Sequence, residues 1–254
     1  MKCKKIAVLF AAILLVAFHA IAQSPDQLAA QAAKAYNTRQ YTQAIALYGK
    51  IIDAGYESYA LYYNLGNAYY RNNEIAQAML YYEKALKLSP NNEDIKHNIE
   101  VVNNKLTDKV EKIPELFYKR WWKELLNIMS IDALAITTII LLSLSLLLIA
   151  IYIASTNLLV RKLSFWSGVF LLLLFSIGTI TASQRNHYLS SNHEAIIFAQ
   201  TVNIKSSPDE NSKDIFVLHE GTKVTLLDIV ADWQEIRISN GSTGWIKMTD
   251  IRVI

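Results

Sequence analysis

The sequence predicts a multidomain membrane protein with an all-α helical repeat domain, a two-helix transmembrane hairpin and a C-terminal all-β barrel. Three observations predict this order. Residues 25–92 repeat small and aromatic side chains with a period of about 34 residues. Two long runs without a charged residue follow, 134–154 and 163–182. Residues 193–254 then change to short alternating apolar segments separated by turn residues, which is typical of a small β domain.

The N-terminus has the composition of a secretory signal peptide. Three lysines precede an apolar run, 6–18, which is short for a membrane span, and Ala20-Ile21-Ala22 supplies small residues for cleavage. We therefore expect residues 1–22 to be removed. An uncleaved anchor is the alternative, and in both cases the segment that follows is exported.

Charge and cysteine content exclude several functions. The chain has 25 Lys and Arg and 22 Asp and Glu, and removing Lys2, Lys4 and Lys5 leaves equal numbers of the two signs. The sequence therefore gives no reason to expect a nucleic-acid surface. Cys3, the one cysteine, leaves with the signal peptide, so we expect no disulfide, no thiol nucleophile and no lipid-modified cysteine in the mature chain.

The repeat has a recognisable consensus. Its second unit carries Tyr62, Leu65, Gly66, Tyr69, Ala78, Tyr82, Ala85 and Pro90, and its first unit carries Leu28, Ala32, Ala44, Tyr48 and Ile51. Residues 59–92, and less completely 25–58, resemble the tetratricopeptide repeat (TPR) family. In such a unit two helices cross closely at the small residues, and aromatic residues fill the gap between successive pairs. We expect a TPR domain over 25–108, in which 93–108 covers the last apolar face as a capping helix or as the first helix of a third unit.

The TPR resemblance implies a peptide-binding groove lined by the first helix of each unit. The groove positions are Tyr36, Asn37, Tyr63, Asn67, Tyr70 and Arg71, and His97, Asn104 and Lys105 extend the line. Tyrosine and amide side chains suit the backbone and side chains of an extended peptide. The alternative is that the tyrosines only pack between helices.

The two uncharged runs predict a membrane anchor. At about 1.5 Å per residue each run extends for about 30 Å, the thickness of a bilayer core. We expect spans at 131–154 and 163–182, joined by a polar turn at 155–162 and followed by a linker at 183–192. Two buried helices of a soluble core are the alternative. Neither run has an ionisable residue near its centre, which argues against a transporter or proton relay.

The signal peptide and two spans predict a two-pass protein of the bacterial inner membrane, with its N-terminal and C-terminal domains in the periplasm. Arg161 and Lys162 in the turn then face the cytoplasm, as the positive-inside rule expects. The approach to the first span, 109–130, carries more basic residues and points the other way. With Trp121 and Trp122 this approach predicts either an amphipathic helix on the bilayer surface or an ordinary aromatic belt.

The C-terminal segment predicts a small barrel of five strands. The expected strands are 195–198, 216–218, 223–229, 233–238 and 245–247, and Asn240-Gly241 predicts a hairpin between the last two. The segments Val202-Asn203-Ile204-Lys205-Ser206-Ser207-Pro208, Leu218-His219-Glu220-Gly221-Thr222-Lys223-Val224 and Gly244-Trp245-Ile246 resemble the bacterial SH3 (SH3b) family. The resemblance implies binding of proteins or of cell-wall peptides, with Trp233 and Trp245 as groove candidates or as packing residues.

The sequence predicts no enzyme. The histidines of the C-terminal half, His187, His193 and His219, have no metal-ligand spacing, and no phosphate-binding loop, nucleophile elbow or dinucleotide fingerprint is present. We therefore expect no metal and no cofactor.

The order of signal peptide, TPR, two spans and SH3b resembles the BatE-like family of bacterial aerotolerance (Bat) operons. This resemblance implies a scaffold in a membrane complex linked to aerotolerance or envelope stress, with von Willebrand A-type membrane proteins as partners. Two alternatives remain open. One is a sensor or anchor that binds peptidoglycan through the SH3b domain, and the other is an accessory subunit of a membrane enzyme.

Overall fold

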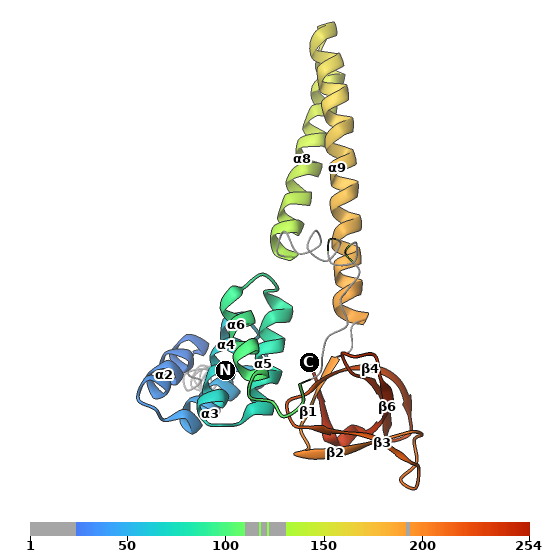
Figure 1. Ribbon diagram of the computed structural model, residues 1–254. Coiled ribbons are helices and arrows are strands. Elements are labelled where there is room, and N and C mark those ends of the chain that lie inside the picture. Colours follow the sequence, from blue (N-terminus) through green and yellow to red (C-terminus); the bar gives the residue numbers. More distant parts are fainter. Residues whose placement is uncertain (1–23, 110–116, 118–120, 122–130, 192–193) are drawn as a thin grey trace, which may run out of the picture. The chain divides into compact units, whose positions relative to one another are not determined.

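The computed structural model describes residues 24–109, 117, 121, 131–191 and 194–254 (Figure 1). These residues belong to two compact units, Met1–Ala85 and Leu86–Ile254. The predicted signal peptide, the cleavage site and most of the expected interfacial segment lie outside the described residues. Within that segment, the side chains of Phe117 and Trp121 are each 78% exposed.

The first unit contains two helical pairs. The helices are α2 (Pro25–Asn37), α3 (Tyr41–Asp53), α4 (Tyr59–Arg71) and α5 (Ile75–Leu88), the last of which extends a few residues into the second unit. Each helix of the second pair begins at the position that the repeat period predicts from the first pair. The helical repeat architecture is therefore confirmed.

The turns and caps follow the same period as the helices. The hydroxyl oxygen of Ser24 accepts a hydrogen bond from the backbone N–H of Gln27 at the start of α2, and Ser58 does the same at the start of α4. Between the helices of each pair one residue adopts the left-handed conformation, Arg39 with φ 63° and Asn73 with φ 65°. Equivalent positions of the two repeats thus use the same local backbone geometry.

Small residues and tyrosines build the core of the repeat as the sequence predicts. Gly66 lies against the ring of Tyr82, and a Cβ atom at Gly66 would come within 2.7 Å of that ring. Ala44 and Ala78 are fully buried. The core cluster that joins the first pair of helices to α4 contains Ala32, Ala35, Ala44, Leu47, Tyr48, Ile51, Leu61, Leu65 and Ala68.

Helix α6 (Glu93–Asn103) belongs to the second unit and keeps the repeat register. Its N-cap residue, Asn92, accepts a hydrogen bond from the backbone N–H of Ile95 at 3.1 Å, and it lies one repeat period after Ser58. One side of the helix is buried through Ile95, Ile99 and Val102. The register favours the first helix of a third unit over an unrelated cap.

Two long apolar helices, α8 (Ile131–Ala154) and α9 (Leu158–Ser191), lie side by side (Figure 1). By length and composition, the segments Ala133–Ala154 and Leu158–Gln184 could each cross a membrane, and only 11% of each segment's most apolar window is buried. A core helix of a soluble protein would be mostly buried, so the exposed apolar surface agrees with a surrounding bilayer.

The helices differ from the expected bounds at the turn. Helix α9 begins at Leu158, so residues 155–157 connect the two helices, whereas a turn over 155–162 was expected. Arg161 and Lys162 therefore lie near the start of α9. Asn157 caps this start through a hydrogen bond from the backbone N–H of Leu159 to its side-chain oxygen at 2.9 Å. At the other end α9 continues to Ser191, through most of the expected linker.

The seam between α8 and α9 uses small residues. The buried hydroxyl of Ser145 donates a hydrogen bond to the backbone oxygen of Gly168 at 3.0 Å. A Cβ atom at Gly178 would come within 2.6 Å of the methyl group of Thr138. Such close backbone approach is how apolar helices pack when water supplies no driving force between them.

The C-terminal domain is an antiparallel seven-stranded sheet with the order β3-β2-β6-β5-β4-β1-β7. The strands are β1 (Glu194–Ile197), β2 (Thr201–Lys205), β3 (Asp214–His219), β4 (Lys223–Val230), β5 (Trp233–Arg237), β6 (Thr243–Lys247) and β7 (Ile251–Val253). The expectation of five strands is wrong, because β2 and β7 were not predicted. Strand β7 has only three residues, whereas β2 has five, as many as β5 and β6, so its length does not explain why it was missed.

The barrel core is aliphatic. Its buried residues are Ala195, Ile197, Ile204, Leu218, Val224, Ile236, Ile238, Ile246 and Ile251. The predicted hairpin at Asn240-Gly241 is confirmed between β5 and β6, and Gly241 has φ 90°. Gly244 allows β6 to approach β2, because a Cβ atom there would overlap the side chain of Ile204 and come within 3.0 Å of the backbone oxygen of Lys205.

Candidate functional site

Tyr36 and Tyr41, from the first helical pair, lie close to Arg71, from α4. We call these three residues the tyrosine–arginine cluster. The rings of Tyr36 and Tyr41 meet edge to face, with their centroids 5.5 Å apart. The Nε–H of Arg71 donates a hydrogen bond to the phenol oxygen of Tyr41 at 3.3 Å, and its guanidinium carbon lies 5.7 Å from the centroid of that ring. The cluster therefore connects the two repeats through exposed and half-buried groups.

The surroundings of Tyr36 favour the neutral form of its phenol. Burial raises the pKa of Tyr36, the positive charge of Arg71 opposes this rise, and the phenols of Tyr41 and Tyr63 add to it. Arg71 is exposed, and its hydrogen bond with Tyr41 raises the pKa of the guanidinium further. A charged guanidinium beside phenols offers hydrogen-bond donors, acceptors and aromatic faces to an extended peptide.

The residues predicted to line the groove lie in different environments. Tyr63 contributes to the raised pKa of Tyr36, and Tyr70 contributes to the raised pKa of Arg71, so these four residues lie in one neighbourhood. Asn37 is exposed at the last position of α2. The predicted extension, His97, Asn104 and Lys105, belongs to the second unit, and all three residues are exposed.

Asn67 has a structural role that the sequence did not reveal. Its side-chain oxygen accepts a hydrogen bond from the hydroxyl of Tyr82 at 2.7 Å. Tyr82 is 1% exposed, and its ring lies 6.0 Å from that of Tyr63. Asn67 therefore fixes the ring that packs on Gly66, so its substitution would disturb the repeat as well as the groove.

A second group of tyrosines packs inside the repeat. The rings of Tyr69 and Tyr81 stack with centroids 5.4 Å apart, and Tyr62 lies 6.0 Å from Tyr81. The amine of Lys84 lies 5.9 Å from the centroid of Tyr81. Burial, with a contribution from Glu57 at Tyr62, raises the pKa of Tyr62 and of Tyr69 to about 12. For these tyrosines the alternative of packing between helices is the better description.

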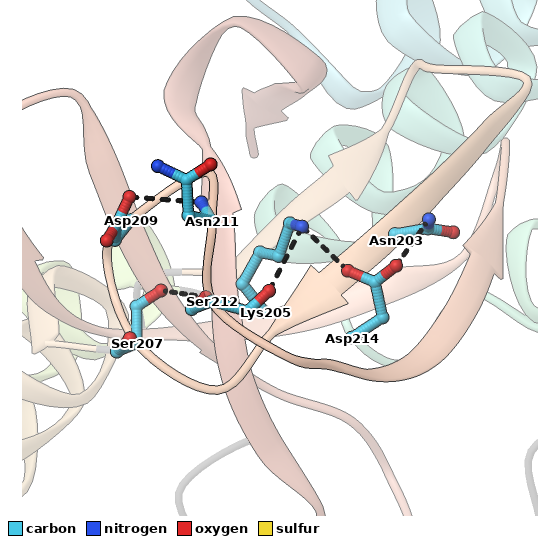
Figure 2. Close-up of polar contacts among 7 residues, drawn as sticks. All are labelled: Asn203, Lys205, Ser207, Asp209, Asn211, Ser212 and Asp214. Atoms are coloured by element: carbon cyan, nitrogen blue, oxygen red, sulfur yellow. Dashed lines mark hydrogen bonds and ion pairs between the residues drawn. The ribbon is translucent and has the colours of Figure 1, made fainter.

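The barrel presents a loop between β2 and β3 whose polar groups satisfy one another (Figure 2). The amine of Lys205 contacts the carboxylate of Asp214 at 2.8 Å and the backbone oxygen of Ser212 at 3.2 Å. The side-chain amide of Asn203 donates to the same carboxylate at 2.9 Å. Figure 2 also shows that Asp209 accepts a hydrogen bond from Asn211. The loop is thus held in shape by its own side chains.

The two predicted tryptophans have different environments. Trp233 is 8% exposed, and the amine of Lys247 lies 5.7 Å from its ring centroid, so it is a packing residue. Trp245 is half-buried on β6, opposite Lys205 of β2 and Glu235 of β5. On β3, which is separated from β6 by β2, the side chains of Ile215 and Val217 are exposed. Trp245 is the better candidate for a groove wall.

The described part of the chain contains no group of three His, Cys, Asp or Glu side chains that could hold a metal ion. The clusters above contain no nucleophile paired with a base. Their chemistry is that of recognition by aromatic faces, hydrogen bonds and charge.

Comparison with known families agrees with this architecture. Residues 59–92 match the family model of the tetratricopeptide repeat, and residues 200–251 match that of the bacterial SH3 domain. Both are interaction domains without catalytic activity of their own. No curated protein matches the chain. The multidomain layout of TPR repeat, two apolar helices and SH3b barrel is therefore shown.

Proposed function

We propose that this protein is a membrane-anchored interaction scaffold whose TPR domain binds a peptide segment of a partner protein at the tyrosine–arginine cluster. The observation that carries the proposal is the cluster itself, in which Tyr36, Tyr41 and Arg71 come from three helices of two repeats. A core needs no exposed arginine beside half-buried phenols, whereas peptide recognition uses such groups.

The anchor is the hairpin of α8 and α9. Its apolar side chains face outward, and its small residues close the seam between the two helices. Two spans would place the repeat and the barrel on the same side of the membrane. One contact supports this arrangement: the carboxylate of Asp108, before α8, accepts a hydrogen bond from the backbone N–H of His219, after α9. Residues in direct contact must share a compartment.

We assign that compartment to the periplasm of a bacterial cell, on the basis of the signal-like N-terminus. The partners proposed from the BatE-like resemblance are von Willebrand A-type proteins of an aerotolerance complex. The short connection at 155–157 can hardly carry a signal into the cytoplasm unaided, which favours scaffolding over signalling.

The test is detergent extraction of the tagged full chain, followed by identification of the membrane proteins that remain bound. We expect Arg71→Ala to reduce recovery of a specific partner by about tenfold, because an arginine at the centre of an interface commonly contributes more than 1 kcal/mol. Lys50→Ala, which changes an exposed lysine on α3, is the matched control. Equal recovery with Arg71→Ala and Lys50→Ala would rule out the cluster as the binding site.

A second function has its own observation in favour. Trp245, Ile215 and Val217 expose apolar surface beside the rigid β2–β3 loop, which suits binding of a cell-wall peptide. The full chain should then sediment with purified sacculi, and Trp245→Ala should abolish this without affecting partner recovery. Absence of sedimentation would exclude the cell-wall function and leave the scaffold function standing.

A further inference from the structure

The turn between β3 and β4 binds a carboxylate that comes from a distant part of the chain. One oxygen of Asp108 accepts hydrogen bonds from the backbone N–H of His219 at 2.6 Å and from the hydroxyl of Thr222 at 2.8 Å. The other oxygen lies 2.7 Å from Nδ1 of the His219 ring. All three residues belong to the unit Leu86–Ile254.

The burial of these groups shows that the contact is more than a surface encounter. The side chain of Asp108 is only 12% exposed and that of His219 is 32% exposed. Thr222 is buried, and so is Leu106, two residues before Asp108. Three donors that converge on one carboxylate replace its lost water, and hydrogen bonds to a charged acceptor are roughly twice as strong as neutral ones.

The ionisation of Asp108 agrees with this geometry. Burial alone would raise its pKa, but the hydrogen bonds from the His219 ring, the His219 backbone and Thr222 outweigh burial and lower the pKa. The carboxylate is therefore charged at neutral pH. A neutral imidazole with its proton on Nδ1 is sufficient to donate the third hydrogen bond.

We propose that the His219–Thr222 turn is a carboxylate-binding site of the barrel, occupied in cis by Asp108, for which an acidic segment of a partner protein competes. In the occupied state residues 104–108 form a strap that ties the end of α6 to the barrel. A partner that supplies its own carboxylate releases this strap, so binding at the barrel frees residues 104–108. The proposal is independent of peptide binding at Arg71.

The occupied state is tested by hydrogen exchange on the purified full chain. We expect Asp108→Asn to accelerate exchange of the amide of His219 about tenfold or more, because this amide loses its charged acceptor. Exchange in the β5–β6 hairpin should not change, which shows that the barrel remains folded. Glu100→Gln, which neutralises an exposed carboxylate on α6, should have no effect on His219. Unchanged exchange at His219 in Asp108→Asn would overturn the proposal.

The capacity to accept a carboxylate in trans is tested in an Asp108→Ala chain. A synthetic peptide with the sequence of residues 101–109 is added at millimolar concentration, and its counterpart with asparagine in place of the aspartate serves as the control. We expect the acidic peptide to restore slow exchange at His219 and the asparagine peptide to leave it fast. Restoration by both peptides, or by neither, would contradict a carboxylate site open to a partner.

Discussion

The tyrosine–arginine cluster of the repeat and the β2–β3 loop of the barrel both place a cation among polar side chains, but they hold it differently. Lys205 of the loop contacts a carboxylate and a backbone oxygen, and Asp214 in turn binds Asn203. Arg71 of the repeat is exposed, and its Nε–H donates to a phenol, that of Tyr41, rather than to a carboxylate. A neutral partner is easier to exchange for a ligand than a charged one.

This difference supports the separate tasks proposed for the two domains. Lys205, Asn203 and Asp214 are paired with one another, which supports the proposed role of the loop as a frame for the surface around Trp245. In the cluster, the guanidinium of Arg71 can exchange its hydrogen-bond partner for a ligand. The cluster is therefore the better candidate for peptide recognition. Substitutions that disturb each region by itself test whether the two regions differ in this way.

The largest expected effect is that of Gly244→Ala in the barrel. The new methyl group would overlap Ile204 and approach the backbone oxygen of Lys205, which cannot move without displacing β2. We expect a loss of about 3 kcal/mol in the free energy of unfolding of the barrel. Native-state hydrogen exchange of the core strands measures this loss, and exchange in α2–α4 should stay unchanged. A loss below about 1 kcal/mol would show that the frame is less rigid than proposed.

The next prediction compares alanine substitutions at two glycines, Gly66 and Gly49, that lie within helices of the repeat. Gly66→Ala forces a methyl group against the buried ring of Tyr82, which Asn67 holds in place. We expect a loss of about 1–2 kcal/mol in repeat stability, because the clash outweighs the better helix propensity of alanine. Gly49→Ala has no atom within 4 Å of the new methyl group and should stabilise the repeat by about 0.5–1 kcal/mol. Effects of the same sign at both positions would contradict the packing described for Gly66.

The buried tyrosines of the repeat predict that the stability of the repeat, and not that of the barrel, depends on pH. Burial raises the pKa of Tyr62 and Tyr69 to about 12 in the folded chain, whereas an unfolded tyrosine ionises near pH 10. Their contribution to stability is therefore complete below about pH 10 and is lost as the pH rises toward 12, by roughly 1–3 kcal/mol. Urea unfolding of the repeat, followed by circular dichroism between pH 8 and 11, measures the onset of this loss. A constant midpoint up to pH 11 would contradict the buried, neutral state of these phenols.

The smallest effect is expected for Asp214→Asn in the β2–β3 loop. The ion pair with Lys205 is partly exposed, so its loss should reduce barrel stability by only about 0.5 kcal/mol. The loop should become more mobile, which faster exchange of the amides at 206–213 would report. If the loop stays as slow as in the unchanged chain, its shape comes from the backbone rather than from the polar network.

The sequence predicts the repeat well because its signals are local and periodic. Gly66, Ala78 and Tyr82 occupy fixed positions for steric reasons, and the structure confirms their packing. The tyrosine–arginine cluster was predicted less completely. Tyr41 was missed because it begins the second helix of its unit, whereas the groove rule considers only first helices. The structural role of Asn67 depends on a contact with the next helix, which spacing alone does not reveal.

Other features of the molecule were not predicted from the sequence. Strand β7 was missed because three residues carry too few alternations to be distinguished from a loop, whereas β2 is as long as β5, which was predicted. The contact between Asp108 and His219 joins residues 111 positions apart. His219 lies in the SH3b-like segment 218–224, but nothing in that pattern points to Asp108, so only the folded chain shows that they meet.

We propose that the repeat and the barrel share one compartment outside a two-span anchor, and cysteine labelling of intact spheroplasts tests this topology. In a Cys3→Ser background, single cysteines replace Gln43 in α3, Ser239 in the barrel and Thr156 between α8 and α9, all of them exposed. A membrane-impermeant maleimide should label the first two in intact spheroplasts and the third only after permeabilisation. Protection of either domain, or labelling of position 156 in intact spheroplasts, would contradict the account.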